Sequence, residues 1–344
     1  MSRENWVLAA AILGSGMAFI DSSVVTVAMP TMPTMPTMPA RLGAGAGGVQ
    51  WILNAYTPML GGLILTAGAA GDRYGRKRVF LYGVVVFAVA SAACGAAPST
   101  GLLIAARGLQ GIGGALMVPG SLALIAASFP GEARGRAIGT WAGAAALTTA
   151  LGPVVGGWLI GAVGWRAIFL INLPLALATW VIARAHVPES RADDPGPLDG
   201  VGTALVTGGL GLLTLAAIGG VAWPGVVAAA GIALLLAFAR HEARTPHPML
   251  PLSLFRSGAF SGAKIATLLL YAALSGVIFL LPFALMQVLG DTPAEAGASF
   301  LPLSLTARPA VAVQRCGVAA HRAVVADGGR WWPDRWSPPP ASSV

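Results

Sequence analysis

Long apolar segments separated by short polar stretches constrain this chain more than any other feature of its sequence. Nine of them are long enough, or nearly so, to cross the hydrocarbon core of a bilayer, which takes about 20 helical residues. Lipid offers backbone polar groups no partner, so the sequence predicts an all-α membrane protein. A tenth segment could begin near Ala298. The nine cover residues 6–29, 49–70, 79–97, 102–128, 136–160, 166–184, 201–219, 224–239 and 259–288.

Composition supports lipid as the solvent for most of the chain. Of the 344 residues, 56% are hydrophobic and 10% are charged, whereas soluble proteins average about 25% charged residues. The net charge of +8 does not indicate a nucleic-acid partner, because the basic residues lie between apolar segments. Neither the cysteines nor the histidines show ligand spacing, so we expect no metal site and no cofactor. A phosphate-binding Gly-x-x-x-x-Gly-Lys-Ser/Thr loop is also missing, which argues against ATP hydrolysis.

The basic residues predict the orientation. With the N-terminus in the cytoplasm, 13 Lys and Arg residues near helix ends fall inside, and only Arg41 and Arg166 fall outside. Positive residues collect on the cytoplasmic side of membrane proteins, so we expect a multi-pass protein of the cell (inner or plasma) membrane with a cytoplasmic N-terminus. The inner set is Arg3, Arg73, Arg76, Lys77, Arg78, Arg134, Arg136, Arg184, Arg191, Arg240, Arg244, Arg256 and Lys264.

Two stretches depart from this pattern. Residues 29–39 read MPTMPTMPTMP, which we expect to form an extended outer loop because proline lacks the amide donor of a helix. Residues 306–344 hold five prolines and three tryptophans but no apolar segment of spanning length. We expect this tail to be disordered or to follow a change of reading frame.

The sharpest motif, GAAGDRYGRKR at residues 68–78, lies between the second and third segments. It can be a tight cytoplasmic turn whose positive charges only set the topology. It can also be a gate, in which glycines bring two helix ends together and Asp72 forms a breakable pair with a basic residue or a helix end. The candidate gating residues are Gly68, Asp72, Arg73, Gly75, Arg76 and Lys77.

Two charges lie inside apolar segments. Asp21 is about 12 Å from the outer end of its helix and Arg107 about 8 Å from the outer end of its own, at the rise of an α-helix. Charges at such depth are costly and normally face a cavity or each other. Asp21 and Arg107 could therefore form a structural ion pair or share an aqueous cavity, or Arg107 could extend its head to the interface.

Small residues mark the fifth segment. Gly152 and Gly156 are four residues apart and share a helix face, which permits close contact with a neighbouring helix. Pro153 is expected to kink the helix.

These motifs resemble those of the major facilitator superfamily. Residues 68–77 resemble its signature loop, G-x-L-A-D-R-x-G-R-K, and depart from it only at Ala70 and Gly71. The segment around Asp21 resembles the antiporter pattern L-D-x-T-V-V-N-V-A-L-P, with Ser23 for Thr and Thr26 for Asn. The pattern R-x-x-Q-G is intact at Arg107, Gln110 and Gly111. By this resemblance Arg107 takes part in proton coupling, and Asp21 and Gln110 serve the same cavity.

The fifth segment resembles the motif that separates antiporters from symporters of this fold, in which Thr148 replaces one glycine. The matched positions are Gly139, Gly152, Pro153, Gly156 and Gly157.

Together with stretches at 50–56, 164–174 and 248–256, the motifs resemble the fourteen-helix drug:proton antiporters of the EmrB/QacA type. The resemblance covers about residues 4–305 and then stops, from which a truncated member is expected. It implies an N-terminal six-helix bundle (1–185), a cytoplasmic loop with linker helices seven and eight (186–240), the start of a C-terminal bundle (241–305), and an atypical tail (306–344).

The resemblance implies a transporter and not an enzyme. It would export drugs or other hydrophobic or cationic small molecules in exchange for protons, with the substrate, protons and the lipid bilayer as partners. Two alternatives stay open. The chain could be a membrane fragment that does not transport, or the same fold could export a metabolite.

Overall fold

The computed structural model describes residues 2–31, 46–193, 196–219, 221–246, 248–250 and 252–300, and every element of regular structure in this part is helical. The helices are α1 (Arg3–Thr31), α3 (Ala46–Asn54), α4 (Tyr56–Tyr74), α5 (Arg76–Ala96), α6 (Thr100–Ser128), α7 (Gly131–Ala162), α8 (Ala167–Leu170), α9 (Asn172–His186), α10 (Gly200–Ile218), α11 (Pro224–Glu242), η1 (Leu252–Arg256), α12 (Gly258–Ala284), η2 (Leu285–Leu289) and α13 (Pro293–Ala298).

The predicted all-α membrane fold is confirmed. Within the described residues, nine helical stretches are long and apolar enough to cross a membrane, and they overlap the nine predicted segments. The expectations for residues 32–39 and for the tail at 306–344 fall outside the described residues, as does Arg41. The short helix α13 ends where a tenth segment was expected to begin.

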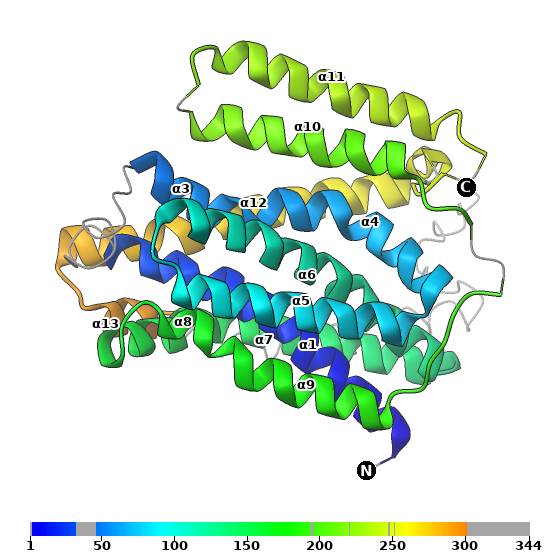
Figure 1. The fold of residues 1–344 in the computed structure, drawn as a ribbon, viewed down its shortest axis with the longest axis horizontal. Helices are drawn as coiled ribbons and strands as arrows, with labels where there is room; N and C mark the ends of the chain where they lie inside the picture. The colour runs from blue at the N-terminus through cyan, green and yellow to red at the C-terminus, as the bar shows by residue number, and fades with distance from the viewer. Residues whose placement is uncertain are drawn as a thin grey trace, which may run out of the picture.

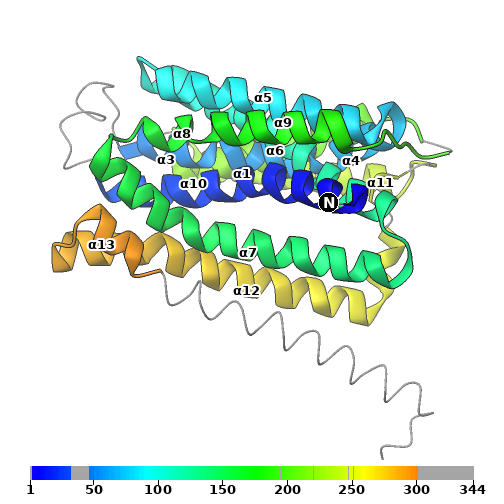
Figure 2. The ribbon, with the colours of Figure 1, turned by 90° about the horizontal axis from the view of Figure 1, so that it is seen from below.

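The helices lie roughly side by side as a bundle (Figures 1 and 2). α1 runs through the bundle and contacts α6, α7 and α9, while α5 and α6 pack along each other. Buried aromatic and aliphatic side chains fill the space between these helices, including Phe80, Phe87, Met117 and Phe169. The functional motifs predicted from the sequence therefore lie on helices that contact one another.

Two of the nine spans are divided at a single residue, although each of them remains one candidate span, Gln50–Tyr74 and Ala167–His186. The first breaks at Ala55, between α3 and α4, and the second at Ile171, between α8 and α9. A proline follows each break, Pro58 and Pro174. The proline ring clashes with the carbonyl four residues earlier, and the proline nitrogen cannot donate to that carbonyl. For this reason α3 ends at Asn54 and α8 ends at Leu170.

Proline does not end a helix everywhere in this chain. α7 continues through Pro153, and α6 continues through Pro119. α1 also continues through Pro30 to Thr31, so the expectation of extended chain from residue 29 is wrong for residues 29–31. Packing neighbours can keep a membrane helix intact when one backbone hydrogen bond is lost.

The pair α10 and α11 lies beside this bundle and contacts it through α4 (Figure 1). A Cβ on Gly62 would lie 2.7 Å from the Cα of Thr207, so the absence of a side chain lets α4 and α10 touch. Thr66 Oγ1 and Thr203 Oγ1 are hydrogen bonded at 2.6 Å. Asp199 caps α10 by accepting from the Gly202 amide at 2.8 Å, and it also contacts His241 Nε2 at 2.8 Å.

Candidate functional site

Asp21, Arg107 and Gln110 meet in the interior of the bundle. Asp21 and Gln110 are fully buried and Arg107 is 1% exposed. Arg107 Nη1 is ion-paired with Asp21 Oδ2 and donates to Gln110 Oε1 at 2.6 Å. Gln110 Nε2 donates to Asp21 Oδ1 at 2.8 Å. Of the geometries considered from the sequence, the structure thus holds the direct ion pair, and Arg107 does not extend to the interface.

Two further polar residues join this group, which we call the Asp21 network: Asp21, Arg107, Gln110, Ser91 and Asn172. Asn172 Nδ2 donates to Asp21 Oδ1 at 3.0 Å and to Ser91 Oγ at 3.2 Å. Gln110 Nε2 also donates to Ser91 Oγ, at 2.8 Å. Sequence reasoning did not select either residue for a site. The sequence offered a clue to Asn172, because a side-chain amide is unusual in an apolar segment. It offered none to Ser91, because serine is common in membrane helices.

The two helix breaks contribute to the surroundings of Arg107. Ile52, near the end of α3, supplies the carbonyl that accepts from Arg107 Nε at 3.1 Å. Carbonyls in the last turn of a helix lack intrahelical partners, so they can accept from a side chain. Tyr56, at the start of α4, and Phe169, on α8, place their ring centroids 4.9 and 5.9 Å from the guanidinium carbon. Arg107 is thus surrounded by acceptors and ring faces that favour a cation.

One acceptor of the network lacks a donor. Asn172 Oδ1 is buried and has no hydrogen-bond partner within the described residues. A buried acceptor without a donor costs about 1–3 kcal/mol, so a ligand group that donates a hydrogen bond would be favoured at this atom.

The turn between α4 and α5 holds the predicted gating residues. Asp72 pairs with Arg76, with Arg76 Nη2 2.7 Å from Asp72 Oδ1, as expected for a partner one turn away. Gly75 has a φ of 111°, a conformation that residues with a side chain rarely adopt, so glycine permits this sharp turn. Gly68 lies further back on α4, where a Cβ would come within 4.0 Å of Pro119 on α6.

This turn is tied to the segment that follows α9. Arg76 N donates to Ser190 O at 2.8 Å, and Ala192 N donates to Asp72 O at 3.0 Å. Lys77 N donates to Glu189 Oε1 at 3.0 Å. Arg73 Nη1 reaches Gly196 O at 3.5 Å. No hydrogen bond or ion pair within the described part of the chain joins this turn to the Asp21 network, so they are separate places in the bundle.

The glycines of α7 lie against α1. A Cβ on Gly152 would overlap Ser23 Oγ, and one on Gly156 would lie 2.9 Å from Val24 Cγ1. Pro153 and Gly157 are buried in the same stretch. Gly139, by contrast, has nothing within 4 Å of its Cβ position among the described residues. The close contact between α7 and α1 therefore involves the second half of the predicted antiporter motif, and on α1 it includes residues on both sides of Asp21, namely Ile20, Ser23 and Val24.

The family model of the Major Facilitator Superfamily matches residues 11–314. This chain belongs to the major facilitator superfamily. Its members are membrane transporters and not enzymes, in agreement with the sequence prediction.

Curated relatives of this facilitator chain are named for resistance and export. It is 37% identical to the tetracenomycin C resistance and export protein of Streptomyces glaucescens over 305 residues, which cover 86% of this chain and 55% of that protein. It is 36% identical to the multidrug resistance protein Stp of Mycobacterium tuberculosis, with 85% and 55% covered. It is 37% identical to the methylenomycin A resistance protein of Bacillus subtilis, with 86% and 64% covered. The chain thus spans about half to under two thirds of their length.

Solved structures agree on the fold. The facilitator chain superposes on a D-xylose-proton symporter with a TM-score of 0.57 at 17% identity, covering 88% of this chain and 66% of that one. It superposes on the human organic anion transporter MFSD10 with a TM-score of 0.57 at 18% identity, covering 89% and 71%. At these identities the likeness concerns the fold alone.

Proposed function

We propose that this chain takes part in the proton-coupled export of a hydrophobic or cationic small molecule, with Asp21, Arg107 and Gln110 as its coupling group. The buried Asp21 network is the observation that carries the proposal. A carboxylate and a guanidinium in the interior of a membrane bundle are expensive, and such groups usually mark a path for an ion or substrate. The names of the relatives, which combine antibiotic resistance with export, support a drug-like substrate.

The network suggests how a proton would act. With Asp21 ionised, its carboxylate balances Arg107 and accepts from Gln110 and Asn172. A proton on Asp21 would remove the balancing charge and leave a buried guanidinium without an ion partner, a state that costs about 3–5 kcal/mol. The bundle would relieve this cost by rearranging so that water or a substrate group reaches Arg107. Protonation would thereby be coupled to a change of conformation.

The other motifs would act together with this protonation of Asp21. The turn with Gly68, Asp72, Arg73, Gly75, Arg76 and Lys77 serves as a gate. It opens when its hydrogen bonds to Glu189, Ser190, Ala192 and Gly196 break. The glycines of α7 form the tight contact along which α7 moves relative to α1. We assign α10 and α11 to the linker helices of a fourteen-helix antiporter, with the six-helix bundle before them and the start of a second bundle after them. This assignment is supported by the packing of α10 and α11 on each other and, through α10, on α4.

An assay in everted membrane vesicles tests the proposal. Addition of a cationic drug to vesicles that hold the chain should release protons from the lumen, measured with a pH-sensitive dye. Asp21→Asn should abolish this release, because the substituted side chain cannot exchange a proton. Glu132→Gln is the matched control, since it neutralises a carboxylate that is 71% exposed outside the network, and it should leave the release unchanged.

The outcomes distinguish the alternatives. Release that persists in Asp21→Asn would contradict the assignment of the coupling group. A complete lack of release from vesicles that contain the folded chain would favour the alternative of a membrane segment that does not transport by itself. Release driven by metabolites but by no drug in the panel would favour the metabolite exporter.

A further inference from the structure

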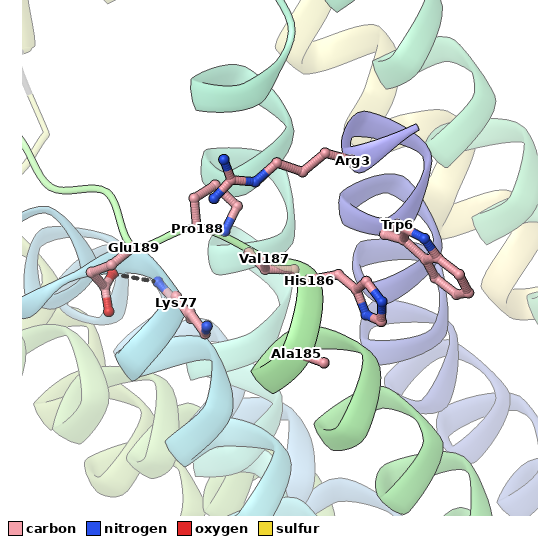
Figure 3. Close-up of a pocket in the computed structure, with 8 residues that line it drawn as sticks. All are labelled: Arg3, Trp6, Lys77, Ala185, His186, Val187, Pro188 and Glu189. Carbon is pink, nitrogen blue, oxygen red and sulfur yellow. Dashed lines mark hydrogen bonds between the residues drawn. The ribbon is translucent and has the colours of Figure 1, made fainter. Parts of the chain in front are cut away.

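A cavity of about 600 Å³ opens at the end of the bundle where α1 and α5 begin and α9 ends. Figure 3 shows its lining: Arg3 and Trp6 from α1, Lys77 from α5, and His186 and Glu189 from the end of α9 and the residues after it. Of these residues only Lys77 belongs to a motif discussed above. Most of the cavity lining is therefore separate from the residues of the proposed transport motifs.

The lining carries an excess of positive charge. Glu189 is its one acid, and its carboxylate is already used: Oε1 accepts from the amides of Lys77 and Ser190 at 3.0 and 3.1 Å. Oε2 of the same residue lies 3.7 Å from Arg78 Nε. Lys77 Nζ donates to the Arg184 carbonyl at 3.0 Å, which leaves its remaining protons available.

Arg3 is the second cation of the cavity. No hydrogen bond or ion pair of its guanidinium is found among the described residues. Arg3 is also the first residue of α1, so its side chain lies at the end of the helix beside the cavity. An anionic ligand in the cavity would therefore meet two cationic side chains, Arg3 and Lys77.

The opposite wall is aromatic. Trp6 and His186 stack with ring centroids 4.5 Å apart and an angle of 21° between their planes (Figure 3). Tryptophan rings favour the level where the membrane meets water. A site with cations at one side and flat rings at the other matches a ligand that has both an anionic group and an apolar part.

We propose that this cavity binds a phosphate group, and that its source is the headgroup of an anionic phospholipid in the leaflet around this end of the bundle. Arg3 and Lys77 contact the phosphate, and the Trp6–His186 stack packs against the glycerol and upper acyl region. A free phosphate would use the cations but not the aromatic wall. The inference does not depend on transport, since it requires only the cavity and its position where two spanning helices begin.

Lipid binding by the purified full chain tests the proposal. Native mass spectrometry would count phosphatidylglycerol and phosphatidylcholine that stay bound, with inorganic phosphate added as a competitor. We expect phosphatidylglycerol to be retained over phosphatidylcholine and not to be displaced by inorganic phosphate. In Arg3→Gln/Lys77→Gln its affinity should fall by about fivefold for each cation removed.

Matched variants make the result decisive. Arg136→Gln/Arg240→Gln removes two charges from exposed positions that do not line the cavity, and it should bind phosphatidylglycerol as the parent chain does. Arg3→Lys should retain binding, and Arg3→Gln alone gives a second test if the double variant does not fold. Equal affinity in the cavity and control variants would overturn the site, and displacement by inorganic phosphate would overturn the lipid assignment.

Discussion

At the scale of single residues, Arg107 acts as the centre of the Asp21 network because its guanidinium donates in several directions. Nε bonds to the Ile52 carbonyl, while Nη1 bonds to Asp21 and Gln110. A planar group with several fixed donors can hold a carboxylate, an amide and a carbonyl at once, and an ammonium group cannot reproduce this arrangement.

Arg107→Lys should therefore fail although it keeps the charge. It loses at least one charge-assisted hydrogen bond, and we expect a loss of about 1.5–3 kcal/mol in the free energy of unfolding. Drug-induced proton release should also be lost. Arg136→Lys, at a side chain that is 70% exposed, is the control and should change neither quantity. Normal proton release in Arg107→Lys would show that charge alone is sufficient at this position.

Asp199 offers a test by pH. Burial acts to raise the pKa of its carboxyl, but the Gly202 amide and the His241 ring outweigh burial and hold the pKa below its ordinary value of 3.8. The folded chain thus binds this proton less readily than the unfolded chain. The carboxylate stabilises the fold above pH 3.8, and the contribution is lost as pH falls below that value.

The variant Asp199→Asn keeps a good cap for α10 but has no charge. Its thermal midpoint in detergent should lie below that of the parent chain near neutral pH, and the two midpoints should converge below pH 3.8. A gap of constant size down to about pH 3 would mean that the charge of Asp199 does not stabilise the fold.

At the scale of helices, proline breaks and glycine contacts determine which atoms meet. The break at Ile171 places Asn172 at the start of α9, and the break at Ala55 separates Ile52 and Tyr56 into two helices that both contact Arg107. The small residues of α7 then let α1 approach closely beside Asp21. The geometry of the network therefore depends on residues that carry no charge.

Gly156→Leu should disturb the contact between α7 and α1. Its Cβ alone would lie 2.9 Å from Val24 Cγ1, and the rest of the side chain has no room. Overpacking of this kind costs about 1–3 kcal/mol, measured as a lower unfolding midpoint in detergent. Gly161→Leu, on the same helix with nothing within 4 Å of its Cβ position among the described residues, should be tolerated. Equal losses in both variants would show that the close contact is not what matters.

The spanning helices and the Asp21–Arg107 pair could be predicted because both depend only on segment length and on residue position along the chain. Apolar length predicts a span, and counting residues from a helix end predicts that the two charges lie at similar depth. Ser91 and Asn172 were missed because their contribution depends on the rotation of α5 and α9 about their axes, which packing decides. The breaks before Pro58 and Pro174 were missed for a related reason, since Pro153 and Pro119 lie within continuous helices.

At the scale of the whole molecule, the described part is a bundle with an exposed apolar helix at its side. Large side chains of α12 are more than half exposed, among them Leu268, Leu269, Leu270 and Tyr271. Together with the spanning helices, this surface is suited to lipid or to further helices and not to water.

The proposed orientation can be measured on the whole molecule. Single cysteines would be introduced as Arg191→Cys and Val163→Cys in a background with Cys94→Ala and Cys316→Ser, and labelled with a membrane-impermeant maleimide. Position 191 should react only in everted vesicles and position 163 only in intact cells, because positive residues mark the cytoplasmic side. The reverse pattern would contradict the orientation and would place the cavity of Figure 3 in the outer leaflet.

The segment after α9 has a consequence for rates. Residues 185–189 line the cavity, and residues 189–192 hold the turn between α4 and α5 through Glu189, Ser190 and Ala192. One short segment, residues 185–192, thus lines the cavity and also holds the turn between α4 and α5. A headgroup that occupies the cavity would hold this piece in position and raise the activation barrier for opening the turn. The turnover of the transporter would then depend on the lipid composition around it, even if the affinity for its substrate did not change.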